Sequence, residues 1–105
     1  MKIFYDEGKR VVLSIENDNM LAGTGDRADY HNSTRGEDLY VHQSMAGKKY
    51  YYLLFWTRWK GEENEYRVVT EQEARTWVEE HIGKLCKREI EQCLTEEILI
   101  LEEDA

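Results

Sequence analysis

The sequence has no proline, only two cysteines and no apolar run near the length of a membrane-spanning helix. Such a helix takes about 20 mostly apolar residues. No low-complexity linker divides the chain, so we expect a single domain over residues 1–105. Residues 1–7 lack the long apolar stretch of a secretory signal, and a cytoplasmic protein without membrane contact is expected.

The two cysteines are too few and too far apart for most cysteine chemistry. Cys86 and Cys93 lie in a segment with helical periodicity, where a separation of seven residues is about 10 Å along the axis. That distance exceeds normal disulfide reach. Without a CxxC pattern, neither a structural zinc site nor a redox dithiol is indicated. We expect two free, buried thiols and no cofactor.

Basic side chains are scarce in the C-terminal third of the chain. Residues 1–70 carry eleven acids and ten bases, whereas residues 71–105 carry eleven acids and four bases. Most of the formal net charge of −8 therefore belongs to the second part. A negative field keeps a protein soluble and repels nucleic-acid phosphates, so a protein that coats DNA or RNA is not expected.

Aromatic residues are plentiful, with seven tyrosines, three tryptophans and two phenylalanines. Apolar and polar residues alternate over 3–5 and 11–15, on either side of the glycine-containing segment 6–9. A period of two is typical of β-strands, so we predict an N-terminal hairpin. Over residues 17–38 turn-forming residues dominate, which predicts a long loop and the first place to look for activity.

Alternation returns and predicts a three-stranded antiparallel meander over residues 39–69. Its first strand covers 39–44. The segment 49–59 is the longest strand candidate and should be central in the sheet. After the polar turn 60–64, residues 65–69 form the returning strand.

A capping box predicts where the first helix begins. Thr70 and Glu73 have the spacing at which each side chain bonds the backbone N–H of the other residue. An apolar stripe at helical spacing follows and is interrupted by Gly83. The stripe comprises Ala74, Trp77, Val78, His81 and Ile82. A second helical period runs to about Leu94.

The last residues of the chain have no unique pattern. Residues 98–101 could be a short strand or a last helical turn, and we favour an extended or partner-bound segment. Residues 95–105 as a whole are also compatible with a flexible acidic tail. The complete prediction is an α+β fold, in which the hairpin and the meander form a small antiparallel sheet that packs against one or two C-terminal helices.

The strand predicted over residues 49–59 is apolar or aromatic on both faces. One face carries Tyr51, Leu53, Phe55 and Trp59, and the other carries Tyr50, Tyr52, Leu54 and Trp56. One helix can cover only one face of so small a sheet, so the other is covered by the chain itself or by a partner. Because Tyr and Trp are common interface anchors, we predict a partner-binding surface at Tyr50, Tyr52, Trp56 and Arg58.

The favoured function is a non-enzymatic protein-interaction or regulatory module, with a homodimer as the simplest assembly. A metal-dependent enzyme is disfavoured, because the available ligands lack the fixed spacing of a metal motif. Those ligands are Asp26, Asp29, His31, Glu37, Asp38 and His42. No catalytic residue and no small molecule are indicated.

Two alternatives involve nucleic acid. Basic residues near the aromatic strand could accompany stacked bases, but acidic neighbours and the net charge disfavour this. These basic residues are Lys48, Lys49, Arg58, Lys60 and Arg67. The acidic C-terminal part could instead mimic nucleic-acid phosphates and inhibit a DNA- or RNA-handling protein. Glu89, Glu91, Glu96 and Glu97 would carry that activity.

Residues 37–80 approximately follow a recognisable order of elements: a short strand, a glycine turn, an aromatic strand, a polar turn and a capped helix. It is carried by residues 38–41, Gly47, residues 50–53, Gly61, residues 69–74 and Trp77. In this order of elements the chain resembles a set of small uncharacterised bacterial and mobile-element proteins with a helix that begins Thr-Glu-x-Glu-Ala. The resemblance implies a bacterial or mobile-element origin and brings no activity, substrate or cofactor.

Overall fold

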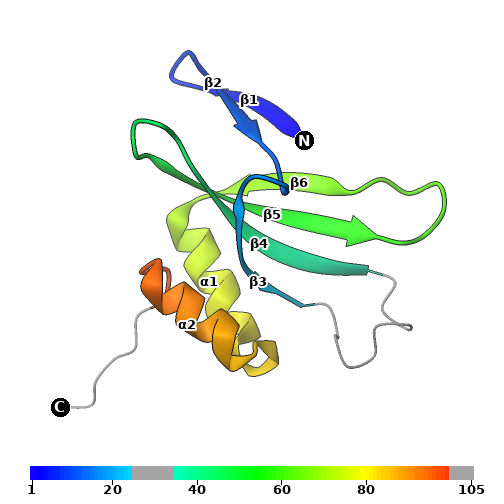
Figure 1. The fold of residues 1–105 in the computed structure, drawn as a ribbon. Helices are drawn as coiled ribbons and strands as arrows, with labels where there is room; N and C mark the ends of the chain where they lie inside the picture. The colour runs from blue at the N-terminus through cyan, green and yellow to red at the C-terminus, as the bar shows by residue number, and fades with distance from the viewer. Residues whose placement is uncertain (25–34, 100–105) are drawn as a thin grey trace.

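The computed structural model describes residues 1–24 and 35–99 of the chain. In these ranges a two-stranded hairpin is followed by a four-stranded sheet and then by two α-helices joined by a 3₁₀-helix (Figure 1). This is the predicted α+β fold, with a hairpin, an antiparallel meander and C-terminal helices. No helix in the described part is long and apolar enough to cross a membrane.

The N-terminal hairpin consists of β1 (Lys2–Asp6) and β2 (Lys9–Leu13), which pair antiparallel as predicted. Glu7 and Gly8 form its two-residue turn, with φ angles of 51° and 80°. Positive φ at both central positions is typical of the type I′ turn, whose twist matches that of the strands it joins.

The second sheet is an antiparallel meander in the order β3-β4-β5-β6. Its strands are β3 (Asn19–Gly23), β4 (Arg35–Gln43), β5 (Lys49–Thr57) and β6 (Glu65–Val69). The three predicted strands are present, and β5 pairs with β4 on one side and β6 on the other, so its central position is confirmed. The strand β3 was not predicted.

The predicted loop over residues 17–38 is wrong in part, because β3 and the beginning of β4 lie within it. Residues 21–23 are all buried, and the register against β4 shifts between Met20 and Ala22. A bulge at this point breaks the alternation of inward and outward side chains, so the strand shows no period of two. Residues 25–34 of the predicted loop lie outside the described ranges.

The first helix, α1 (Glu71–His81), begins at the predicted capping box. The Thr70 hydroxyl accepts from the Glu73 N–H, and the Glu73 carboxylate accepts from the Thr70 N–H, both at 3.0 Å. Its buried residues are Ala74, Trp77 and Val78. Ile82, predicted to extend this stripe, is 39% exposed because the chain turns there into η1 (Ile82–Lys84).

The chain turns back onto the core after α2 (Lys87–Thr95), which corrects the extended conformation predicted for residues 98–101 at its two described positions, Ile98 and Leu99. The N–H groups of Ile98 and Leu99 both donate to the Cys93 carbonyl, at 3.0 and 3.2 Å. Glu97 precedes them with a φ of 59°. Such a left-handed residue is a common helix ending, often with an apolar contact behind it. Ile98 and Leu99 are accordingly buried, and residues 100–105 lie outside the described part.

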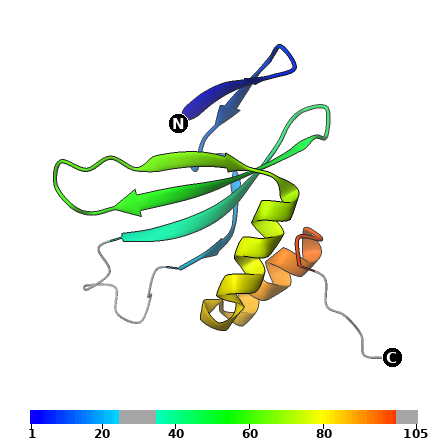
Figure 2. The same ribbon diagram turned by 180° about the vertical axis from the view of Figure 1, so that it is seen from behind.

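Three layers result: the hairpin, the four-stranded sheet and the helices (Figures 1 and 2). On the helix side, Leu53 of β5 packs in one buried cluster with Trp77 and Val78 of α1. On the other side, Tyr52 of β5 packs in a second cluster with Leu13 of β2. The chain therefore covers the first part of both faces of β5 itself.

Candidate functional site

The four predicted partner-binding residues differ in accessibility. Tyr52 has no exposed surface, and Tyr50 and Trp56 are half-buried against the same cluster under the N-terminal hairpin. Arg58 is exposed. Tyr52 cannot contact a partner in this fold, which corrects the prediction for that residue. Because Arg58 is exposed, the far end of β5 is the most accessible part of the predicted surface.

Asp18 anchors the covered part of this face. Its carboxylate accepts from the Tyr52 hydroxyl at 2.7 Å and from the Ser14 N–H at 2.9 Å, and it lies 2.7 Å from His42 Nδ1. The Asp18 side chain is only 6% exposed. Burial, followed by the hydrogen bond to Asp18, raises the pKa of Tyr52. These groups hold β4, β5 and the turn before β3 together, so we assign them a structural role.

Asp6 fixes the hairpin to the β4–β5 turn. Its carboxylate accepts from Lys48 Nζ at 2.6 Å and from the Tyr50 hydroxyl at 2.7 Å. The hydrogen bond from Lys48, followed by that from Tyr50, lowers the pKa of Asp6, and the same bond raises the pKa of Lys48. Beside this contact, a groove of about 490 Å³ lies between β2 and the β4–β5 turn.

The far end of β5 carries a group of residues that we call the aromatic end, made of Phe55, Trp56, Arg58, Trp59 and Arg67. Phe55 lies on the helix side of the sheet and Trp56 on the hairpin side, so the aromatic end wraps around the strand. The Arg58 guanidinium lies 5.3 Å from the centre of the Trp56 ring, and the Arg67 guanidinium lies 4.6 Å from the Phe55 ring. Trp59 is 55% exposed. Contacts between a cation and a ring contribute about 0.5–1 kcal/mol at exposed sites, so they help to hold the arginines over the rings.

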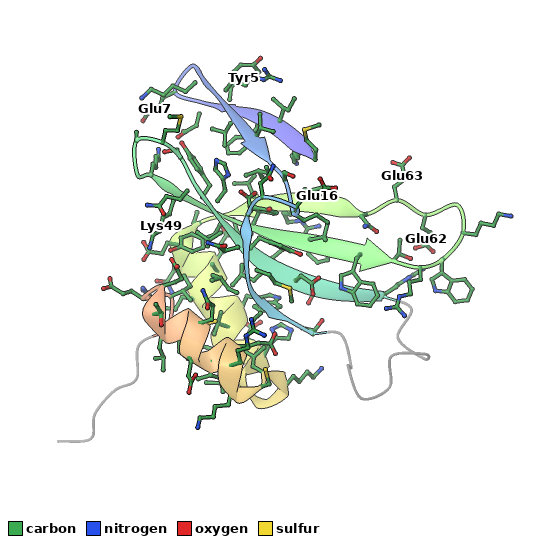
Figure 3. The ribbon with its side chains drawn as sticks, viewed as in Figure 1. Tyr5, Glu7, Glu16, Lys49, Glu62 and Glu63 are labelled. Atoms are coloured by element: carbon green, nitrogen blue, oxygen red, sulfur yellow. The ribbon has the colours of Figure 1, made fainter. Side chains whose placement is uncertain are left out.

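Hydrogen bonds order the β5–β6 turn that carries Trp59. The Trp59 N–H donates to the Thr57 hydroxyl at 3.1 Å, and the Thr57 N–H donates to Asn64 Oδ1 at 3.0 Å. The Thr57 hydroxyl donates to Glu62 at 3.1 Å, and Glu62 also pairs with Arg35 of β4. Glu62 lies at the tip of the sheet that points away from the helices (Figure 3). The turn is thus a fixed support for the Trp59 indole.

A depression of about 370 Å³ adjoins the aromatic end. Its lining includes Arg35, Glu37, Phe55, Trp56, Glu62 and Glu65. Rings, an arginine and several carboxylates therefore meet at one place. A surface with both charge signs and exposed rings resembles a protein interface more than a phosphate site, which needs cations in excess.

The predicted metal ligands are not brought together in the described residues. Across residues 1–24 and 35–99, no three His, Cys, Asp or Glu side chains are grouped so as to hold a metal ion. The Glu37 carboxylate lies 3.4 Å from Trp77 Nε1 and 3.6 Å from His81 Nε2, on the helix side of the sheet. His42 is on the opposite face of β4. Asp26, Asp29 and His31 lie outside the described part.

Two of the four acids that were predicted to mimic phosphates are used inside the fold. Glu89 is buried, and its carboxylate accepts from the Gly23 N–H at 2.7 Å and from the Cys86 N–H at 3.1 Å. Glu96 pairs with Lys49 at 2.9 Å. Only Glu91 and Glu97 of that set are exposed. The role of Glu89 had no signal in the sequence, because its partner in β3 is 66 residues away.

Comparison with protein-family models, with curated proteins and with solved structures finds no match to this chain. The resemblance to small bacterial and mobile-element proteins therefore stays a prediction.

Proposed function

We propose that this protein is a non-enzymatic protein-interaction module and that the aromatic end is its contact surface. The observation that carries the proposal is the exposure of Trp59, which presents 55% of its surface on a hydrogen-bonded turn. Trp and Arg are the residue types most enriched among those that dominate the binding energy of protein interfaces. The aromatic end places both types within one short stretch of β5 and the turn after it.

The order of this surface supports the proposal. A side chain that is already held in place loses little conformational freedom when a partner binds. The backbone of Trp59 is bonded to Thr57, and the rings of Phe55 and Trp56 already have arginines stacked over them. Folding therefore already orders most of this surface, and a partner that binds there causes little further loss of conformational entropy.

The distribution of charge supports a protein as the partner. Arg67 pairs with Glu65, and Arg35 pairs with Glu62 in the adjoining turn, so the aromatic end and its border carry both signs. Mixed charges around a central ring are typical of the polar rim of a protein interface. A second copy of the chain is the simplest partner that such a surface offers.

Sedimentation velocity over a range of protein concentrations tests self-association. We expect the wild-type chain to form a reversible dimer and the Trp59→Ala variant to stay monomeric at the same concentrations. Ile82→Ala is the matched control, because Ile82 is also a partly exposed apolar residue but lies at the end of α1. This control should associate as the wild type does.

A second experiment covers partners other than the chain itself. A photo-crosslinking aromatic amino acid replaces Trp59, and adducts formed in an extract of the source cells are identified by mass spectrometry. We expect one dominant adduct that disappears when Trp56→Ala is added. A wild-type chain that remains monomeric at millimolar concentration and also yields no specific adduct would show that the proposal is wrong.

A further inference from the structure

The open edge of β2 borders a groove at the end of the sheet opposite to the aromatic end. In the described residues, β2 has a strand neighbour on one side only, namely β1. The pairing runs from Asp6 with Lys9 to Lys2 with Leu13. Next to a two-residue turn the flanking pair is hydrogen-bonded, and bonded pairs then alternate with non-bonded ones. Arg10 and Val12 fall in non-bonded pairs, so their backbone N–H and C=O groups point away from β1.

These outward groups border the groove of about 490 Å³. Residues of β2 form one wall, and the end of β4 and the β4–β5 turn form the other. Apolar side chains on both walls, Val11, Val12, Met45 and Ala46 among them, line the space between. A row of unused backbone donors and acceptors beside an apolar channel is suited to an extended peptide, which satisfies the edge and buries every second side chain.

The charge along this edge selects the kind of peptide. Arg10 forms no hydrogen bond and no salt bridge within the described residues, whereas Lys48 on the other wall is paired with Asp6 and Lys9 lies opposite Asp6 in the hairpin. The Arg10 side chain lies on the outer face of the hairpin, beside Tyr5, which points away from the sheet (Figure 3). Carboxylates on the outward face of a bound strand would therefore meet Arg10, which has no acidic partner within the described residues.

We propose that this groove binds an extended peptide segment of a partner protein, in which acidic and apolar residues alternate, and that the segment pairs with β2 as an added strand. Its backbone bonds Arg10 and Val12, its apolar side chains enter the groove, and its carboxylates face Arg10. The inference is independent of the proposed function, since it concerns another end of the sheet and a different kind of contact.

Fluorescence anisotropy with the full chain tests the proposal. The probe is a short labelled peptide that alternates glutamate and valine, with both ends capped. Three comparison peptides are used. One carries lysine in place of glutamate, and the other two carry N-methyl groups on alternate residues in the two possible registers, so that one edge of each can no longer donate. We expect saturable binding of the first peptide, no binding of the lysine peptide, and loss of binding with at least one of the two N-methylation patterns.

Protein variants locate the binding. Val12→Pro removes an outward N–H without removing a bond to β1 and should abolish binding. Arg10→Glu should weaken it about fivefold, the effect of roughly 1 kcal/mol for an exposed ion pair. Val68→Pro on the edge of β6 and Arg88→Glu on α2 are the matched controls and should bind as the wild type does. Circular dichroism establishes that each variant is folded.

Several results would overturn the proposal. Absence of binding by all the peptides would mean that Lys9 and Arg10 only protect the edge from pairing. Equal binding of both N-methylated peptides would rule out strand addition, and this outcome does not depend on whether Val12→Pro folds. Loss of binding in Trp59→Ala would place the peptide at the aromatic end, and loss in Val68→Pro would place it on β6.

Discussion

Gly36 of β4 lies directly opposite Trp56 of β5, and the indole ring occupies the space that a side chain on residue 36 would need. A Cβ atom added to Gly36 would overlap the Trp56 ring. An aromatic ring across from a strand glycine shields the backbone that the glycine leaves uncovered. This pair determines how the Trp56 ring lies in the aromatic end.

The first prediction is that Gly36→Ala displaces the Trp56 ring. The overlap should destabilise the fold by about 1–3 kcal/mol, as extra atoms do in packed sites. Urea unfolding measures the loss, and a change in tryptophan emission should accompany it. Gly47→Ala is not a suitable control, since Gly47 has a φ of 87° and the change would strain the backbone. Ala46→Gly tests the neighbouring exposed turn and should leave the emission unchanged.

Trp77→Ala should cost about 3–5 kcal/mol, as truncation of buried aromatic residues typically does. Trp77 is buried under the sheet, donates to Glu37 and stacks on His81 with ring centres 4.4 Å apart. Thermal and urea unfolding measure the change. Trp59→Ala is the control and should alter stability by less than about 0.5 kcal/mol, since surface changes are usually that small. Equal losses in the two variants would contradict the packing of α1.

Glu89→Gln should destabilise the fold by about 1–3 kcal/mol, because one buried N–H loses its charged acceptor. The two carboxylate oxygens serve Gly23 and Cys86, whereas an amide offers only one oxygen. Hydrogen exchange of the Gly23 and Cys86 amides should rise along with the loss of stability. Glu91→Gln on the exposed side of α2 is the matched control. A variant as stable as this control would show that the carboxylate does not hold α2 to β3.

Acid should loosen the contact between the hairpin and the β4–β5 turn. Lys48, and then Tyr50, hold the pKa of Asp6 below its usual 3.8. A carboxyl group with a lowered pKa contributes stability that is present above the unfolded pKa and is lost as the pH falls through the folded one. NMR shifts of Val11 and Leu13 should therefore change below pH 3.8. Asp6→Asn should lack this step, whereas Glu7→Gln should retain it.

The two thiols should differ sharply in reactivity. Cys86 is exposed, whereas Cys93 is buried, and burial raises the pKa of the Cys93 thiol to about 11. The thiolate is the reactive form, so Cys93 should react with a disulfide reagent only when the chain unfolds. In the native protein one thiol should react promptly, and none should do so in Cys86→Ser. The exposure of Cys86 corrects the expectation that both thiols are buried.

Local patterns determined most of the secondary structure. The capping box of Thr70 and Glu73 needs only residues of one helical turn. The alternation over β5 and the turn at Glu7 and Gly8 likewise depend on neighbours in the chain. Periodicity and capping act over a few residues, so the sequence by itself was enough to predict the hairpin, the meander and the start of α1.

The tertiary structure alone decided which apolar surface is hidden. Tyr52 and Trp56 lie on the same face of one strand, yet the hairpin buries the first and leaves the second partly accessible. The roles of Asp18 and Glu89 were likewise invisible, because they depend on partners 34 and 66 residues away. The burial of a side chain depends on which distant element packs against it. The periodicity of its own strand or helix does not indicate which element that is.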